Sequence, residues 1–477
     1  MSLSQKERLA LPQQDMPSQS PAERIHNTRE VALGYTEEMA RAEAARCLQC
    51  PTRPCTQGCP VSIDIPAFVH AIAEGDDRAA IGIIKRTSLL PAVCGRVCPQ
   101  ERQCMKFCTV GKFAKDPMKA VCIGRLERYV ADRERTEFGV KDPEIAPATG
   151  KRVAVVGGGP AAITVAADVR RAGHEVVLFE AFHKAGGVLM YGIPEFRLPK
   201  AIVESEIDGL RRMGVEIRND FAIGRSRQLR DLLQKDGFDA VFVGTGAGLP
   251  KFMGIPGENL VGVFSANEYL TRANLMKAYD TEHVATPIRH GKRIAVLGGG
   301  NVAMDATRTA LRLGAEKVYL VYRRTEAEMP ARREEIEHAK EEGVEFRLLQ
   351  NAVRVLGDAN DVVTGLECVR FELGEPDASG RRSPVKVPGS EFTLDVDTVI
   401  VAIGNESNPL IARTTPEIKT DAKGHIVVDE NNETSMRNVF AGGDIVLGAA
   451  TVILAMGEGR KAAAAINRRL AGEDARS

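Results

Sequence analysis

The sequence has no excess of charge of either sign and no long hydrophobic run. Its 477 residues include 64 Lys and Arg and 64 Asp and Glu, so the formal net charge at pH 7 is zero. This balance gives no electrostatic footprint for nucleic acid or a membrane surface, and we expect neither as a partner. The longest uncharged apolar stretch, residues 445–457, is too short to span a bilayer. The first residues lack the apolar core of a signal peptide, so we expect a cytoplasmic protein.

Cysteine is scarce over most of the chain and crowded in one part of it. Nine of the ten cysteines lie between residues 47 and 122, and the tenth, Cys368, stands alone. A dithiol–disulfide mechanism is therefore excluded beyond about residue 149, because it needs a pair of thiols. The HExxH, GxSxG and Walker A motifs are also absent, so we expect no catalytic side chain.

The crowded cysteines form two groups whose spacings are typical of iron–sulfur proteins. The groups are Cys47, Cys50, Cys55 and Cys59, and then Cys94, Cys98, Cys104 and Cys108. Eight thiolates suit two [4Fe–4S] clusters with four ligands each. A pair of zinc sites is the alternative, because zinc also binds closely spaced cysteine pairs.

The first group ends in Cys59, which precedes Pro60, and in the second group Pro99 follows Cys98. In two-cluster ferredoxins the fourth cysteine of one run, the one before the proline, binds the other cluster of the pair. The same exchange predicts one cluster on Cys47, Cys50, Cys55 and Cys108. It predicts the other on Cys59, Cys98, Cys104 and, as the candidate for the last position, Cys94.

The rest of the chain alternates strand-like and helix-like runs, and one unit of this α/β pattern occurs twice. Residues 151–173 and 292–314 each contain a short apolar strand, three glycines and an amphipathic helix. Such a turn brings small residues and helix N-terminal N–H groups to the pyrophosphate of a dinucleotide. The small residues are Gly157, Gly159 and Ala162 in the first unit and Gly298, Gly300 and Ala303 in the second. The sequence therefore predicts two dinucleotide sites.

The residues that end the second strand of each unit differ in charge. Glu180 ends this strand in the first unit and provides an acceptor for ribose hydroxyls. Arg323 and Arg324 end it in the second unit, and paired guanidiniums suit a 2′-phosphate. A solvated strand end is the alternative for these arginines. We therefore predict that the second unit binds NADP(H) rather than NAD(H).

The C-terminal segment 438–466 contains a strand, a Gly-Gly-Asp turn and a long helix that begins near Thr451. It resembles the C-terminal FAD motif of flavoproteins that bind two dinucleotides, and the motifs at 244–247 and 402–408 resemble the junctions between their nucleotide domains. The resemblance implies that Asp444 meets the ribityl chain and that the helix N-terminus faces the flavin pyrimidine edge. The further cofactor-binding positions that it implies are Pro160, Ala161, Gly187, Val188, Arg197, Thr245, Gly246, Asn301, Gly404, Gly443, Ala450, Thr451 and Val452.

The cysteine block, both nucleotide units and the Gly-Gly-Asp end together resemble the small (β) subunit family of NADPH-dependent glutamate synthase. The same assembly occurs in the N-terminal half of dihydropyrimidine dehydrogenase and in the large subunit of NADH-dependent ferredoxin:NADP oxidoreductase. Some relatives replace one cysteine ligand by Gln or Glu, and the matching residue here is Glu127. Glu127 and Cys94 are therefore rivals for the last ligand position.

The resemblance implies an α/β fold with two nested Rossmann-like dinucleotide-binding domains, preceded by an α-helical iron–sulfur domain. The expected domains are 1–148 for two [4Fe–4S] clusters, 149–286 and 406–477 for FAD, and 287–405 for NADPH.

The implied function is that of an NADPH-dependent reductase subunit with FAD and two [4Fe–4S] clusters. NADPH gives two electrons together and clusters accept one, so a flavin converts between them. The implied partner is a glutamate synthase large subunit with FMN and iron–sulfur, which makes glutamate from glutamine and 2-oxoglutarate, or another flavin or iron–sulfur acceptor subunit. The alternative functions are the large subunit of an electron-bifurcating NADH-dependent ferredoxin:NADP oxidoreductase, and a non-enzymatic electron-transfer scaffold.

Overall fold

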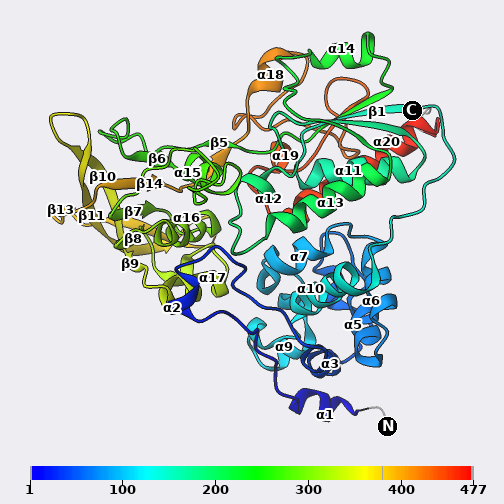
Figure 1. Cartoon of the computed structure of the whole chain (residues 1–477), viewed down its shortest axis with the longest axis horizontal. Helices are drawn as coiled ribbons and strands as arrows, with labels where there is room; N and C mark the ends of the chain where they lie inside the picture. The colour runs from blue at the N-terminus through cyan, green and yellow to red at the C-terminus, as the bar shows by residue number, and fades with distance from the viewer. Residues whose placement is uncertain (1–2, 379, 474–477) are drawn as a thin grey trace.

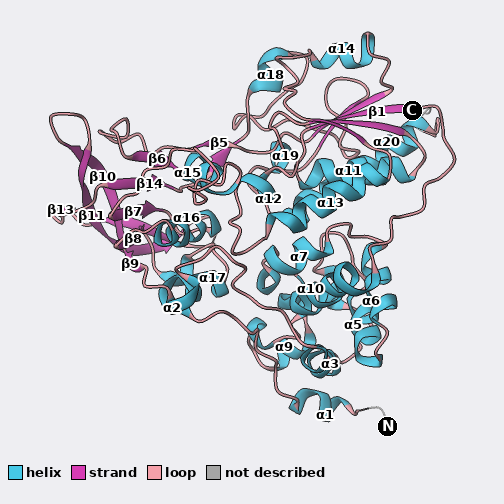
Figure 2. Cartoon of the chain, viewed as in Figure 1, coloured by secondary structure: helices cyan, strands magenta, loops and turns pink. Residues whose placement is uncertain are grey.

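The computed structural model describes residues 3–378 and 380–473. Its elements form a helical N-terminal region and two parallel sheets with their helices (Figure 1). Among the described residues before β1 (Arg152–Val156), Figure 2 shows helices and loops without a strand. None of the described helices combines the length and the apolar character that crossing a membrane requires.

The N-terminal region consists of short helices joined by loops that carry cysteines. They are α1 (Gln5–Ala10), α2 (Pro21–Arg24), α3 (Glu37–Ala45), α4 (Pro54–Gln57), α5 (Ile65–Glu74), α6 (Asp77–Lys85), α7 (Pro91–Val97), α8 (Cys104–Phe107), α9 (Thr109–Phe113) and α10 (Ile123–Arg133), with the 3-10 turns η1 (Gln100–Arg102) and η2 (Pro117–Lys119) and the π-helical turn η3 (Glu134–Phe138). Helix α5 illustrates why they form, since Asp64 accepts the N–H of Ala67 at its start and Gly75 ends it in the left-handed conformation. Its buried face, with Phe68 and Ile72, packs on α3, α6 and α10.

The first parallel sheet has the strand order β16-β4-β1-β2-β3. Its other strands are β2 (Glu175–Phe179), β3 (Glu216–Arg218), β4 (Ala240–Val243) and β16 (Val439–Ala441). Its helices are α11 (Pro160–Arg171), α12 (Val188–Tyr191), α13 (Lys200–Arg212), α14 (Leu229–Gln234), α18 (Leu410–Thr414), α19 (Asp444–Leu447) and α20 (Val452–Leu470). The central strands β1 and β4 are apolar and buried, as expected for a parallel sheet covered on both faces. The C-terminal strand β16 pairs with β4 through Val439 and Val241, so the end of the chain completes this sheet.

The second parallel sheet has the order β6-β14-β7-β8-β9. Its strands are β6 (Val263–Ser265), β7 (Arg293–Leu297), β8 (Lys317–Tyr322), β9 (Glu345–Leu348) and β14 (Thr398–Val401). Its helices and turn are α15 (Ala266–Asn274), α16 (Asn301–Arg312), η4 (Glu326–Glu328) and α17 (Arg333–Glu341). An antiparallel extension consists of β10 (Gln350–Gly357), β11 (Val363–Pro376), β12 (Arg382–Lys386) and β13 (Phe392–Leu394).

The second sheet is inserted in the chain between β4 and β16 of the first. The short strands β5 (Leu249–Pro250) and β15 (Asn405–Glu406) pair where the chain crosses between the two sheets. This arrangement confirms the predicted α/β class of two nested dinucleotide-binding units after a helical region. The domain boundaries stay a prediction, although β6 belongs to the second sheet and lies before the expected boundary at residue 287.

An N-terminal arm, residues 12–33, runs from the helical region to the second nucleotide unit, where α2 lies beside α17 (Figure 1). Arg24 of the arm is 2% exposed, and it lies 2.7 Å from both Glu341 and Glu342. Glu342 also accepts hydrogen bonds from Arg308 and Arg312 of α16 at 2.7 Å. The arm therefore ties the helical region to this unit through a buried ionic network.

Candidate functional site

The first glycine turn lies between β1 and α11 and depends on close backbone contacts. Gly157 has a φ of 105°, and a Cβ there would come within 2.5 Å of the carbonyl oxygen of Gly244. Gly159 precedes α11, and Pro160 occupies the first turn of that helix, where a missing N–H costs nothing. A Cβ on Gly187 would lie 2.7 Å from the Cα of Gly159. Only glycines permit these approaches, which leave the helix N-terminus open to a phosphate group.

Helix α20 covers this turn. Ala161 is 5% exposed, and a Cβ on Gly459 of α20 would lie 2.6 Å from the Ala161 carbonyl oxygen. A Cβ on Gly443 would meet the Ala161 Cβ at 2.9 Å. The structure thus places the Gly-Gly-Asp segment and the first turn side by side.

Three titratable side chains surround the first turn. Glu180 follows β2, burial raises its pKa, and its Oε1 accepts the N–H of Phe182 at 2.8 Å. Asp444 begins α19, and burial raises its pKa to about 6 despite the N–H of Ala450. Burial, followed by the charges of Asp444 and Glu180, raises the pKa of Tyr191 to about 12. A buried and a half-buried carboxylate beside one turn suit a ligand that donates hydroxyl groups.

The crossover after β4 adds a hydroxyl group without a partner. Thr245 Oγ1 is buried and has no hydrogen-bond partner among the described residues. Next to it, Gly246 has a φ of 70°, and a Cβ there would meet no atom within 4 Å. A buried polar atom is costly unless something satisfies it. The turn, the two carboxylates and this hydroxyl therefore fit a bound FAD.

The start of α20 joins the first nucleotide unit to the helical region. Thr451 caps the helix, and its Oγ1 accepts hydrogen bonds from the N–H of Leu454 at 3.4 Å and from Gln103 Nε2 at 3.1 Å. The predicted residues Ala450 and Val452 flank this cap. The predicted residue Val188 begins α12.

The second glycine turn, between β7 and α16, repeats the geometry of the first. Gly298 has a φ of 143°. A Cβ on Gly298 would come closer to the carbonyl oxygen of Ala402 than a Cβ on Gly157 would come to that of Gly244. Gly300 precedes α16, and Asn301 Oδ1 accepts the N–H of Arg332 at 2.9 Å. The remaining predicted positions are Ala303, buried in α16, and Gly404, which follows β14.

The two arginines that follow β8 lie in different surroundings. Arg323 is exposed. Arg324 is buried, and it donates to the carbonyl oxygen of Arg382 and to Asp377, both at 2.7 Å. Protein groups of the β11–β12 hairpin thus engage Arg324, and the pairing of both guanidiniums on a 2′-phosphate stays a prediction.

Arg197 also differs from its predicted place. Its Nη1 donates to both carboxylate oxygens of Asp305 at 2.7 and 2.8 Å, and its Nε lies 3.0 Å from Glu335. Both carboxylates belong to the second nucleotide unit, on α16 and α17. Arg197 therefore links the two units, whereas the sequence predicted a contact with a cofactor.

Four cysteines from both sequence groups line one small cavity in the helical region, and we call them the distal group. They are Cys47, Cys50, Cys55 and Cys108. Burial first, and then neighbouring thiols such as Cys108, raise the pKa of Cys47 to about 11 and that of Cys55 to about 12. Thiols in such a place become thiolates only beside a positive centre such as a metal.

The other four cysteines form a second cluster of thiols, which we call the proximal group. They are Cys59, Cys94, Cys98 and Cys104. Burial raises the pKa of Cys104, and the charges of Cys59 and Cys98 raise it further. The structure thus brings together the same four cysteines that the ferredoxin pattern assigns to one cluster.

Neither group is arranged for a single ion. In the described part of the chain, no set of three or more His, Cys, Asp or Glu side chains is placed as the ligands of one metal ion. A cluster has an inorganic core, so its ligands surround a volume and do not converge on one point.

The rivals for the last ligand position both lie at the proximal group. Glu127 is buried, which raises its pKa to about 8, and its Oε1 has no hydrogen-bond partner among the described residues. Cys94 is also buried, and its Sγ lies 3.6 Å from the Sδ of Met456 in α20. Glu127 is the rival with an unsatisfied buried oxygen.

The proximal group lies against α20. Besides the contact of Cys94 with Met456, a Cβ on Gly457 would lie 3.0 Å from the carbonyl oxygen of Pro60, which follows Cys59. Gln103, next to Cys104, donates to Thr451 at the helix start. Three separate contacts therefore connect these cysteine loops to the helix that covers the first turn.

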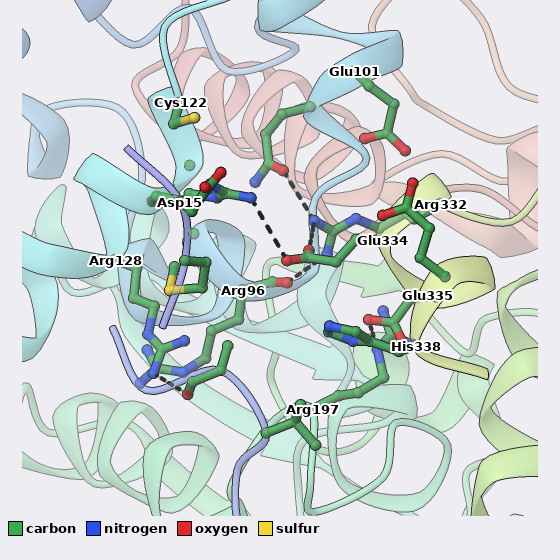
Figure 3. A pocket seen from close by; sticks show the side chains of 18 of the residues that line it. Asp15, Arg96, Glu101, Cys122, Arg128, Arg197, Arg332, Glu334, Glu335 and His338 are labelled. Atoms are coloured by element: carbon green, nitrogen blue, oxygen red, sulfur yellow. Dashed lines mark hydrogen bonds and ion pairs between the residues drawn. The ribbon is translucent and has the colours of Figure 1, made fainter. Parts of the chain in front are cut away.

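A larger cavity of about 310 Å³ lies where the three regions meet (Figure 3). Its charged lining includes Arg96, Arg125, Arg128, Arg197, Arg332, Glu334 and Glu335. These side chains pair with one another or with neighbours, as Arg332 does with Glu334 at 2.8 Å. Burial lowers the pKa of His338 on the same wall, and the positive charge of Arg308 lowers it further. The cavity is an ionic junction between domains and does not include either glycine turn.

Sequence reasoning missed two residues that connect the regions. Gln103 contacts the start of α20, and Arg102 contacts the loop after η4 in the second nucleotide unit. Their position between Cys98 and Cys104 was the only available signal, because neither residue belongs to a motif.

Comparison with known proteins divides the chain as the fold does. Residues 24–138 match the family described as dihydropyrimidine dehydrogenase domain II, 4Fe-4S cluster. Residues 151–464 match the pyridine nucleotide-disulphide oxidoreductase family. The chain is 39% identical to the glutamate synthase [NADPH] small chain of Halomonas elongata, over 94% of this chain and 95% of that protein. The chain belongs to the glutamate synthase small-chain family. This membership confirms the predicted family and the prediction of an NADPH-dependent flavin iron–sulfur oxidoreductase.

Other members and relatives of the glutamate synthase small-chain family agree with this assignment. The small chain of Azospirillum brasilense is 38% identical, over 95% of this chain and 94% of its own length. The NADP(+)-dependent formate dehydrogenase subunit beta of Moorella thermoacetica is 39% identical, but the match covers only 60% of that protein. Among solved structures, Mycobacterium tuberculosis FprA in complex with NADPH has a TM-score of 0.57 at 20% identity, covering 69% of this chain and 86% of FprA, and supports the fold.

Proposed function

We propose that this chain is the NADPH-oxidising subunit of a glutamate synthase. Its partner would be a larger subunit that makes glutamate from glutamine and 2-oxoglutarate. The observation that carries the proposal is the contact between the proximal group and α20. The cysteines that would hold a cluster touch the helix whose start would face the flavin.

The residues assigned to FAD surround the first turn. Gly157 and Gly159 would leave room for the pyrophosphate, while Glu180 and Asp444 would accept hydrogen bonds from the ribose and ribityl hydroxyls. The unpartnered Thr245 hydroxyl would be satisfied by the same ligand. When bound, FAD takes up two electrons together and releases them singly to iron–sulfur clusters. The N-terminus of α20, capped by Thr451, would direct its positive dipole end toward the flavin and would stabilise negative charge there.

The second turn would hold NADPH, with the 2′-phosphate on Arg323. Arg323 is exposed at the end of β8, whereas Arg324 is engaged by Asp377 and Arg382. A guanidinium provides the charge-assisted contact that separates NADPH from NADH. We therefore assign this selectivity to Arg323 alone.

Two [4Fe–4S] clusters are proposed for the cysteine groups. The distal group would hold one, and Cys59, Cys98 and Cys104 would hold the other, with Glu127 as its fourth ligand because Oε1 has no other partner. Cys47 and Cys50 of the distal group are only partly buried, so a partner subunit can approach this side.

The relatives favour glutamate synthase over the other candidate functions. The small chains of Halomonas elongata, Azospirillum brasilense and Escherichia coli match over at least 92% of their own length. The formate dehydrogenase subunit matches over 60% of its length, so its larger assembly has parts that this chain does not cover.

The proposal can be tested on anaerobically purified protein. NADPH should bleach the flavin spectrum faster than NADH, and about eight iron and eight sulfide should be found per chain. Addition of a glutamate synthase large subunit should then give glutamate from glutamine and 2-oxoglutarate. A flavin that NADPH does not bleach would leave only the scaffold function, and zinc without sulfide would refute the clusters.

A further inference from the structure

The loop of residues 329–332, which we call the linking loop, supports the second glycine turn. The N–H of Ala331 donates to the carbonyl oxygen of Gly299 at 3.2 Å. The N–H of Arg332 donates to Asn301 Oδ1 at 2.9 Å. The backbone of the linking loop is therefore bonded directly to the turn assigned to NADPH.

The linking loop is held from its other side by Arg102 of η1 in the helical region. Its Nη1 donates to the carbonyl oxygen of Pro330 at 2.7 Å. Its Nη2 donates to the carbonyl oxygens of Met329 at 2.8 Å and Ala331 at 3.2 Å. One guanidinium thus holds the backbone of three consecutive residues, a task that its fork of donors suits.

A second arginine makes the contact reciprocal. Arg332 of the linking loop donates from Nη1 to the carbonyl oxygen of Arg96 at 2.7 Å, on the wall of the cavity in Figure 3. Arg96 precedes Cys98 by two residues, and Arg102 precedes Cys104 by two. Both contacts therefore end within two residues of cysteines of the proximal group, in α7 and η1.

The same segment reaches the flavin side of the molecule. Gln103 follows Arg102 directly and donates to Thr451 Oγ1 at the start of α20. A continuous path of bonded contacts therefore runs from Asn301 through the linking loop, Arg102 and Gln103 to Thr451. This path spans the distance between the turn assigned to NADPH and the helix start assigned to the flavin edge.

We propose that Arg102 is a positioning residue for hydride transfer. It fixes the turn that holds NADPH relative to the start of α20, so that the two ring systems meet in a reactive geometry. The inference rests on the proposed function, because it needs NADPH at the second turn and FAD at the first. Positioning of this kind matters because a displacement of about 1 Å can lower a rate by about a hundredfold.

The test compares Arg102→Ala with Arg102→Lys and with the control Arg86→Ala, which removes another exposed arginine of the helical region. Flavin reduction is followed by stopped-flow absorbance at several NADPH concentrations. The limiting rate constant should fall about tenfold or more in Arg102→Ala. The Kd for NADPH should change less than about twofold, because the glycine turn and Arg323 are intact. Arg102→Lys should recover part of the rate, since an ammonium group also donates to carbonyl oxygens.

The outcomes separate this inference from the proposed function. If the unmutated protein does not transfer hydride from NADPH, the proposed function fails. If it does, and Arg102→Ala keeps its limiting rate or loses only NADPH affinity, the positioning role is refuted. Loss of FAD or iron from Arg102→Ala would also refute it, because Arg102 would then be holding the fold.

Discussion

The two glycine turns have nearly the same backbone but differ in how far the rest of the chain covers them. At equivalent positions, Ala161 of the first turn is 5% exposed under α20, whereas Val302 of the second is 36% exposed. The strand-end residues differ in the same way, since Glu180 is buried and Arg323 is exposed. A covered turn suits a cofactor that stays bound, and an open turn suits a nucleotide that must enter and leave. We therefore expect the packing around each turn to match the nucleotide that the turn binds.

The largest effect is expected when the covered turn is blocked. Gly159→Val would place a branched side chain where Gly187 and the pyrophosphate need close backbone approach, so the protein should contain almost no FAD. Gly300→Val is the matched change in the open turn, and it should keep FAD but lose NADPH-driven flavin reduction. Flavin absorbance per chain and stopped-flow reduction measure the two results. Equal FAD contents in both variants would contradict the difference between the turns.

The second-largest effect is expected at Arg323, the exposed residue that follows β8. Arg323→Ala should lower kcat/KM for NADPH by about ten- to a hundredfold, because a charge-assisted hydrogen bond contributes about 1.5–3 kcal/mol. The value for NADH, which lacks the phosphate, should change little. Arg324→Ala is the control, and it should affect both nucleotides alike, since its partners are Asp377 and Arg382. A selective loss of NADPH activity in Arg324→Ala would overturn the assignment to Arg323.

A smaller effect is expected from Asp444, the half-buried carboxylate beside the first turn. The pKa of Asp444 in the folded protein is about 6, above its ordinary value, so FAD-free folded protein binds more protons than the unfolded chain between about pH 4 and 6. Its contribution to the free energy of unfolding should therefore be lost as the pH rises through this window, by about 1–3 kcal/mol. Asp444→Asn should remove this pH dependence in thermal unfolding of the FAD-free protein. An unchanged pH profile would show that Asp444 is not buried in this state.

The smallest effect concerns the hydroxyl without a partner. Thr245→Val should raise the Kd for FAD about five- to tenfold, because one neutral hydrogen bond contributes about 1 kcal/mol. Thr415→Val is a close control, since Thr415 Oγ1 is also buried without a partner in the described part of the chain but belongs to the segment after α18. Titration of FAD-free protein with FAD measures both. Similar losses in the two variants would remove Thr245 from the FAD site.

The sequence predicted those features that depend on local geometry. The glycine turns require small residues at fixed spacing, and the exchange of Cys59 and Cys108 between the cysteine groups follows from the ferredoxin pattern. It did not predict the places of Arg197 and Arg324, because their partners come from α16, α17 and the β11–β12 hairpin. Arg102 was beyond prediction for the same reason, since it binds backbone carbonyl groups, which no sequence motif identifies.

The pairing of β16 with β4 has a consequence for how the protein is made. As the chain leaves the ribosome, β4 has no neighbour on one side until residues 439–441 have been synthesised. By then β14, which ends at residue 401, has emerged, and the second sheet can already be complete. The inserted unit can therefore fold first, while the sheet that surrounds it keeps an open edge. Such an edge is prone to aggregation, so nascent chains interrupted between residues 401 and 439 should be the ones that depend most on chaperones.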